Sequence, residues 1–185
     1  MPPVVTRCTD RVRFIAPSDP AVVWPDDPEE RAKAELAYSQ SYDTSTLKLQ
    51  GTPIVWHIRP LYMADLRALS REAPQIGEDR IALASLPEPV QEQLRASADE
   101  AGDIVLPIWH EDRTPSILCR GVAAVDEHPE VRPVWTGHGE RRALLFSWAR
   151  TVPTDIADDV AGAIMGLSVA SETLKKSSFW RRGKA

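Results

Sequence analysis

Apolar and polar positions alternate most clearly over residues 46–59, near the middle of the chain. Residues 47–50 alternate, the tripeptide Gly-Thr-Pro at 51–53 interrupts the run, and residues 54–59 alternate again. A period of two with β-branched and aromatic residues is typical of half-buried strands. We therefore predict two antiparallel strands that pair across the turn at 51–53, with Trp56 buried and His57 on the opposite face.

A period near 3.6 predicts helices on both sides of this strand pair. The predicted helical segments are 26–42, 61–69, 78–86, 88–101 and 153–176. The last is the clearest, because acidic residues open it and Lys175 and Lys176 close it, in agreement with the helix dipole. Gly162 and Gly166 lie inside it, and each costs about 1 kcal/mol there relative to alanine. We therefore expect another element to pack closely against this glycine pair.

Apolar runs later in the chain predict further strands. Residues 103–109 form a short continuous apolar run, which predicts a buried strand, and residues 117–125 are a second candidate with a bulge at Gly121. Residues 126–140 read as a polar loop with prolines and glycines. Residues 142–149 fit a strand or a short helix, and periodicity does not decide between the two.

Five prolines mark the first 25 residues. Proline lacks a backbone donor and is excluded from central strands, so we predict an extended arm with at most one strand, at 12–15. Phe14 and Trp24 are the large apolar side chains of this arm, and we expect them to anchor it on a surface, either its own or a neighbour's.

These elements define an α+β fold with a small antiparallel sheet, packed helices, an extended N-terminal arm and a long C-terminal helix. We divide the chain into the arm (1–25), a single α+β domain (26–176) and a basic aromatic tail (177–185). A length of 185 residues suits one domain with extensions.

Charge is distributed unevenly along the chain. The last eleven residues, KKSSFWRRGKA, hold five basic and no acidic residues, whereas the rest holds 17 basic and 27 acidic ones and carries −10. Such a tail can contact phosphates, an anionic membrane surface or an acidic protein surface. We keep two interpretations, docking on protein and a solvated, frayed end. Nucleic acid ranks behind them because the acidic body repels it.

Composition excludes several classes of protein. No run approaches the ~18 apolar residues of a membrane span, and MPPVVTRCTD lacks the apolar core of a secretion signal. Cys8 and Cys119 are too few for a disulfide framework, so we expect them to be reduced. These features predict a soluble protein made in a cytoplasm.

Candidate catalytic chemistry is sparse. His110, Cys119, His128 and His138 are spaced by nine, nine and ten residues, with no HxxxH or CxxC pair, so a zinc site remains only an alternative. The chain has no GxSxG elbow and no GxGxxG or GxxxxGK[ST] loop. We therefore predict no catalytic residue, no metal site and no cofactor, and expect a protein that is not an enzyme.

Two stretches carry a resemblance to a known class. They are residues 40–70, with the turn and strand GTPIVWHIRPL before a helix, and residues 153–178, a small-residue helix that ends in LSVASETLKKSSF. The order of these features resembles that of small bacteriophage virion and tail-assembly proteins. The resemblance implies a non-enzymatic role in building or joining a particle, and it assigns no functional residue.

The sequence thus predicts a structural or assembly protein of the tail or head–tail region of a bacteriophage. We expect it to act through contacts with other particle proteins, as an oligomer in its assembly, in the host cytoplasm and then in the virion. The expected docking residues are Phe14, Trp24, Phe179, Trp180, Arg181 and Arg182. One alternative is a metal-dependent enzyme that uses the region of His110, Cys119, His128 and His138. The other is a nucleic-acid-binding accessory protein that uses the basic tail.

Overall fold

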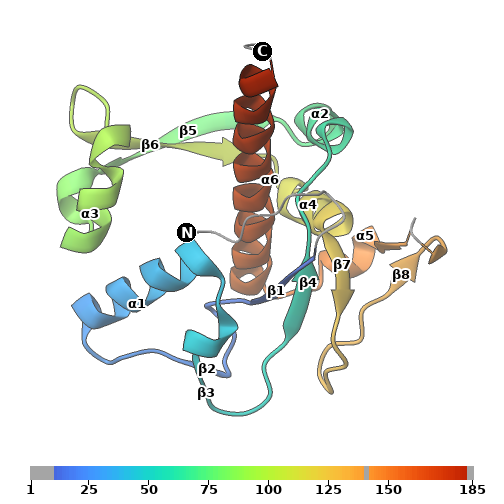
Figure 1. The fold of residues 1–185 in the computed structure, drawn as a ribbon. Helices are drawn as coiled ribbons and strands as arrows, with labels where there is room; N and C mark the ends of the chain where they lie inside the picture. The colour runs from blue at the N-terminus through green and yellow to red at the C-terminus, as the bar shows by residue number, and fades with distance from the viewer. Residues whose placement is uncertain (1–10, 140–141, 183–185) are drawn as a thin grey trace.

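A three-stranded antiparallel sheet with β4 in the middle is the centre of the fold (Figure 1). The computed structural model describes residues 11–139 and 142–182, and the side chains as far as residue 169. In it β4 (Val55–Ile58) pairs on one side with β1 (Val12–Ile15) and on the other with β7 (Val122–Val125). The sheet therefore joins three segments that lie far apart in the sequence.

The predicted hairpin at 46–59 is wrong, although both of its strands exist. β3 (Lys48–Leu49) pairs with β2 (Val22–Val23) rather than with β4. Each strand instead finds its partner in the N-terminal segment, which alternation along 46–59 alone does not reveal. The predicted faces of β4 are confirmed, because Trp56 is fully buried and His57 is partly exposed.

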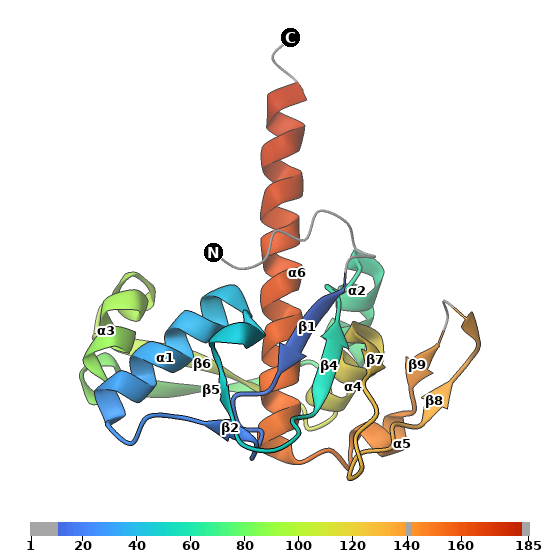
Figure 2. The ribbon, with the colours of Figure 1, turned by 60° about the horizontal axis from the view of Figure 1, so that its bottom comes forward.

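Helices α4 (Arg113–Gly121) and α6 (Thr154–Arg182) pack against each other beside this sheet (Figure 2). The apolar face of α6 includes Val160, Ile164 and Leu167, all buried in the same core as Trp56. Burial of such side chains supplies most of the stabilisation of a helix in a folded protein. The C-terminal part of α6 rises beyond the rest of the molecule in Figure 2.

Helix α1 (Pro28–Ser41) confirms the predicted helix at 26–42. The Asp27 side chain caps it by accepting hydrogen bonds from the backbone N–H groups of Glu29 and Glu30. Tyr38 attaches the helix to the sheet, because its hydroxyl accepts from Ile15 N at 3.0 Å and donates to Ile15 O at 2.8 Å. Burial raises the pKa of this phenol to about 12.

A separate two-stranded ribbon leaves the body beside α6. It consists of β5 (Gln75–Ala82) and β6 (Asp103–Trp109), joined through α3 (Glu88–Leu94) and two single 3₁₀ turns. The predicted strand at 103–109 exists, but most of it is exposed rather than buried. The helix predicted at 78–86 is wrong, because pairing with β6 overrides the helix preference of its Glu, Arg, Ala and Leu residues. The helix predicted at 88–101 is shorter and ends at Leu94.

The strand predicted at 117–125 is only half correct. Residues up to Gly121 are helical in α4 and only β7 is extended, since a short apolar run fits either state. The remaining elements are α2 (Met63–Glu72), β8 (Trp135–Thr136), β9 (Ala143–Leu144) and α5 (Phe146–Ala149), with a short 3₁₀ turn at Thr44–Thr46. Residues 142–149, for which the sequence allowed either a strand or a short helix, contain the strand β9 followed by the helix α5.

The fold is α+β, as predicted, with small antiparallel sheets and a long C-terminal helix. Residues 11–25 of the predicted arm lie on the body through β1 and β2. Among the described helices, none combines the length and apolar character needed to cross a membrane.

Candidate functional site

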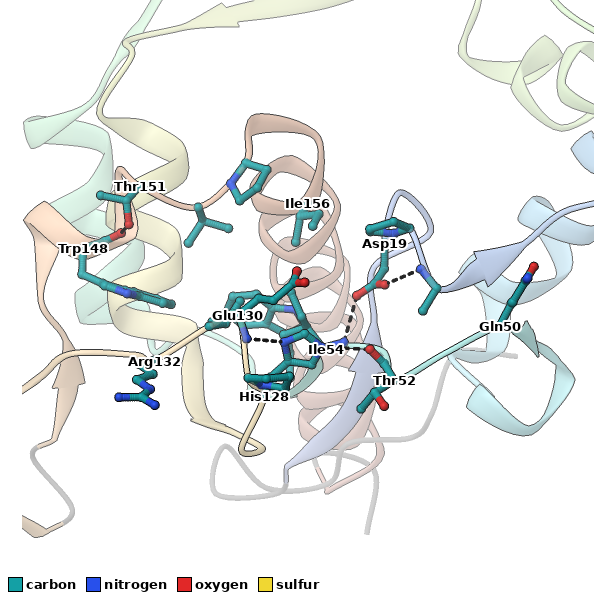
Figure 3. A pocket seen from close by; sticks show the side chains of 17 residues that line it. Asp19, Gln50, Thr52, Ile54, His128, Glu130, Arg132, Trp148, Thr151 and Ile156 are labelled. Carbon is teal, nitrogen blue, oxygen red and sulfur yellow. Dashed lines mark hydrogen bonds between the residues drawn. The ribbon is translucent and has the colours of Figure 1, made fainter.

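A pocket of about 630 Å³ opens where four segments of the chain meet (Figure 3). They are the turn between β1 and β2, the connection from β3 to β4, residues 128–132 after β7, and the turn from α5 into α6. Trp148 lies on one side of the pocket and Asp19 on the other, with Ile156 of α6 between them in Figure 3. This volume lies within the ~300–1,000 Å³ range of ligand sites in proteins.

The buried carboxylate of Asp19 holds one wall of the pocket. Its Oδ1 accepts a hydrogen bond from Ala21 N at 2.8 Å, and its Oδ2 accepts one from Ile54 N at 2.9 Å. The first bond holds the turn itself, and the second ties this turn to Ile54, which lies 35 residues further along the chain. Such a carboxylate acts as a structural clamp, because each of its oxygens accepts a hydrogen bond from a backbone N–H.

His128 ties the loop after β7 to the same connection between β3 and β4. Its Nε2 lies 2.8 Å from Thr52 O, and its Nδ1 lies 3.2 Å from Glu130 N. A carbonyl oxygen accepts and a backbone N–H donates, so the ring is the neutral tautomer with the proton on Nε2. Both ring nitrogens are engaged, and this arrangement leaves neither for proton transfer or metal binding.

Trp56 is one of the residues around the pocket, and its side chain has an unsatisfied polar group that is fully buried in the core. Its indole Nε1 is buried, and no described residue accepts a hydrogen bond from it. A buried donor without an acceptor costs about 1–3 kcal/mol. Asp112 Oδ1 shares the lack of a hydrogen bond but lies 3.0 Å from Arg150 Nη2 in an ion pair, so its charge is compensated.

The residues weighed for a metal site do not converge. No group of three or more histidine, cysteine, aspartate or glutamate side chains suited to a metal occurs in the part of the chain that the structure describes. His110 Nδ1 accepts from Asp112 N at 3.2 Å, and burial raises the pKa of the Cys119 thiol to about 11. A thiol with so high a pKa is a poor nucleophile and a poor ligand at neutral pH.

A histidine–carboxylate pair lies on the face of the central sheet opposite Trp56. His57 Nε2 is 2.7 Å from Asp126 Oδ1, and both side chains are partly exposed. A histidine oriented by a carboxylate is part of many hydrolytic sites, but those sites also need a nucleophile in contact with the ring. No contact of His57 with a serine, threonine or cysteine is observed among the described residues.

The expected docking residues differ in how far their side chains are buried. Phe14 is 2% exposed and packs against Tyr38 and Tyr42 in the core, so the expectation that it anchors a partner is wrong. Trp24 is half-buried, and its Nε1 donates to Pro17 O at 2.9 Å, which attaches it to its own chain. The side chains of Phe179, Trp180, Arg181 and Arg182 lie outside the described part of the structure.

The glycine pair of α6 is not the place where helices approach closely. A Cβ at Gly162 would have no described atom within 4 Å, and one at Gly166 would lie 3.1 Å from the Tyr42 hydroxyl. The close approach instead involves Gly121 of α4, where a Cβ would overlap the Ile164 side chain. Two helices do pack through a glycine, but that glycine is Gly121 of α4 and not one of the expected pair.

Exposed apolar side chains gather on the β5–β6 ribbon. Ile76 is 64% exposed, Leu106 40%, Ile108 45% and Trp109 39%. Leu106 and Ile108 are two residues apart on β6 and therefore share one face of the ribbon with the buried Ile104. Nothing in the sequence indicated this surface, because residues 78–86 fit a helix and residues 103–109 fit a buried strand.

Comparisons with protein-family models, curated proteins and solved structures found no match to this chain.

Proposed function

We propose that this chain is a non-enzymatic structural or assembly protein that acts through protein–protein contacts in the tail or head–tail region of a bacteriophage particle. The observation that supports it most strongly is the exposed apolar surface of the β5–β6 ribbon. The bacteriophage part of the proposal rests on the resemblance in the order of sequence features.

The ribbon suits docking because it is incomplete by itself. A two-stranded antiparallel pair is at best marginally stable in water and gains stability when one face is covered. Leu106 and Ile108 present such a face, and they extend an apolar row that begins at the buried Ile104. A partner that covers this row removes apolar area from water, which is the main driving force of protein association.

Charge on the ribbon favours a basic partner. Residues 75–109 contain seven acidic and two basic side chains, and one of the basic ones, Arg80, is paired with Asp99 at 2.6 Å. Opposite charges at an interface steer association and select partners. The five cations of the last eleven residues give another copy of this chain a complementary charge.

The binding role of the ribbon is tested with Ile108→Lys, which places a charge in the apolar row without touching the core. Val23→Lys is the matched control, since Val23 on β2 is equally exposed at 41%. We expect Ile108→Lys to reduce recovery of the chain with gradient-purified particles at least about tenfold, because an unpaired charge would be buried at the interface.

We expect Val23→Lys to leave that recovery unchanged. Both variants should fold, as judged by circular dichroism and the melting temperature, because both positions face solvent. Equal recovery of the two variants would contradict the role of the ribbon, and absence of the native chain from particles and their intermediates would contradict the assembly function.

A further inference from the structure

The apolar row of the β5–β6 ribbon and the projecting end of α6 are complementary in chemistry. We infer that the ribbon of one copy binds the C-terminal segment 175–185 of a second copy, so that copies of the chain join head to tail. This inference rests on the proposed assembly function and names a partner for the ribbon. Three observations support it: the form of the ribbon face, the charges of the two surfaces, and the direction in which α6 leaves the body.

One face of the ribbon is apolar with a carboxylate at its side. Ile104, Leu106 and Ile108 alternate along β6 and share this face. The strand pairing places Asp79 opposite Leu106 and Gly77 opposite Ile108. A Cβ at Gly77 would lie 3.5 Å from Ile108 Cδ1, so the absence of a side chain there helps to keep Ile108 open to a partner. Such a face suits a helix that carries both apolar and basic residues.

Charge matches the two surfaces. Residues 75–109 hold seven acidic and two basic residues, and the ion pair of Arg80 with Asp99 leaves six acids against one arginine. The last eleven residues hold five basic residues and no acidic one, together with Phe179 and Trp180. Opposite charges steer the two surfaces together, and burial of apolar area stabilises the complex.

The direction of α6 points to a contact between copies rather than within one. The helix continues as far as Arg182, and in Figure 2 its C-terminal end lies well above the ribbon of the same chain. A helix advances about 1.5 Å per residue, so the stretch from residue 170 to 182 spans roughly 20 Å. The segment could reach its own ribbon only by breaking the backbone hydrogen bonds of this helix, whereas the ribbon of another copy meets it without that cost.

A contact of this kind joins two different surfaces. Each copy therefore keeps a free ribbon at one end of the assembly and a free segment at the other. Heterologous contacts continue into rings or open chains, whereas a two-fold contact stops at the dimer. We therefore expect oligomers larger than a dimer, whose size rises with protein concentration.

Size-exclusion chromatography with light scattering tests the contact on the native chain and two full-length variants. Ile108→Lys alters the ribbon and keeps the C-terminal segment. The second variant reverses the five cations of the segment, with Lys175→Glu, Lys176→Glu, Arg181→Glu, Arg182→Glu and Lys184→Glu. The native chain should form oligomers that dissociate when the ionic strength rises from about 0.05 to about 0.5 M, because salt screens the attraction. Each variant alone should be a monomer.

An equimolar mixture of the two variants separates a head-to-tail contact from any other. One variant supplies an intact ribbon and the other an intact segment, so the mixture should form a dimer and no larger species. The mixture also shows that both variants keep a folded, working surface. Leu106→Lys is a second ribbon variant with the same expected result, and Val23→Lys on β2 is the control that should oligomerise like the native chain.

Three results would overturn the inference. They are a native chain that is a monomer at about 100 µM, where a contact of micromolar affinity is saturated, a variant that alone forms the native oligomers, and a mixture that stays monomeric. Particle recovery answers a different question. If Ile108→Lys is lost from particles while the native chain is a monomer, the ribbon binds a different protein, and the assembly function stands without the contact between copies.

Discussion

At the scale of single residues, two glycines have opposite roles in this fold. Gly121 lets α4 approach α6, because a Cβ there would overlap Ile164. Gly162 is exposed in the middle of α6 with no described atom within 4 Å of an added Cβ. The sequence directed attention to Gly162 and Gly166 through their spacing, but spacing within one helix does not identify the residue on the facing helix.

We therefore predict opposite effects of alanine at the two positions. Gly121→Ala should lower the free energy of unfolding by about 1–3 kcal/mol, since Ile164 must move out of a packed core. Gly162→Ala should raise it by about 0.5–1 kcal/mol, because alanine is the better helix former and meets nothing. Urea unfolding of both variants measures the difference. Destabilisation by Gly162→Ala would mean that a further element packs on that face of α6.

Tyr38 gives a second test at the same scale, through its titration. Burial raises the pKa of its phenol from 10.0 to about 12. The neutral phenol therefore stabilises the fold fully below pH 10, and this contribution is lost as the pH rises through 12. A shift of about two pH units corresponds to roughly 2–3 kcal/mol.

Tyr38→Phe removes this titration together with both hydrogen bonds to Ile15. We expect it to cost about 1–3 kcal/mol at pH 7, since the Ile15 backbone groups lose their partner. Between pH 10 and pH 12, unfolding free energies from urea titrations should fall more steeply for the native chain than for the variant. Parallel pH profiles for the two proteins would contradict the burial of the phenol.

At the scale of elements, local signals predicted well wherever a local interaction decides the structure. The helices at 26–42 and 153–176 were predicted from the sequence, because capping and the helix dipole act within one turn. The partner of each strand could not be predicted from the sequence. β2, β3, β5 and β6 each depend on a partner from another segment, and that choice is made by packing that no short window contains.

The same reasoning explains what was predictable about the sites. Trp56 and His57 were correctly placed on opposite faces of β4, because alternation fixes the face of a strand. The pocket that Trp56 helps to line was not foreseen, since it forms where four separate segments meet. Phe14 was mistaken for a surface anchor, because a proline-rich segment gave no sign that its one strand joins the central sheet.

At the scale of the whole molecule, two elements extend from a packed body. The body is the sheet β1–β4–β7 with α4 and α6, and its polar buried groups are largely paired internally. The two extending elements are the β5–β6 ribbon, with its exposed apolar row, and the C-terminal part of α6 as far as Arg182. This division of a stable body from incomplete outer elements would suit the proposed assembly role, because such elements gain stability when a partner covers them.

The proposed docking of the ribbon is tested most directly by hydrogen–deuterium exchange, measured on the chain alone and within purified particles. We predict fast amide exchange along β5 and β6 in the free chain and strong protection of both strands in the particle, because an isolated ribbon opens easily and a covered one does not. The amides of β4 and α4 should be protected in both states and serve as the internal reference. Ribbon amides that exchange equally fast in the free and the particle-bound chain would contradict the account.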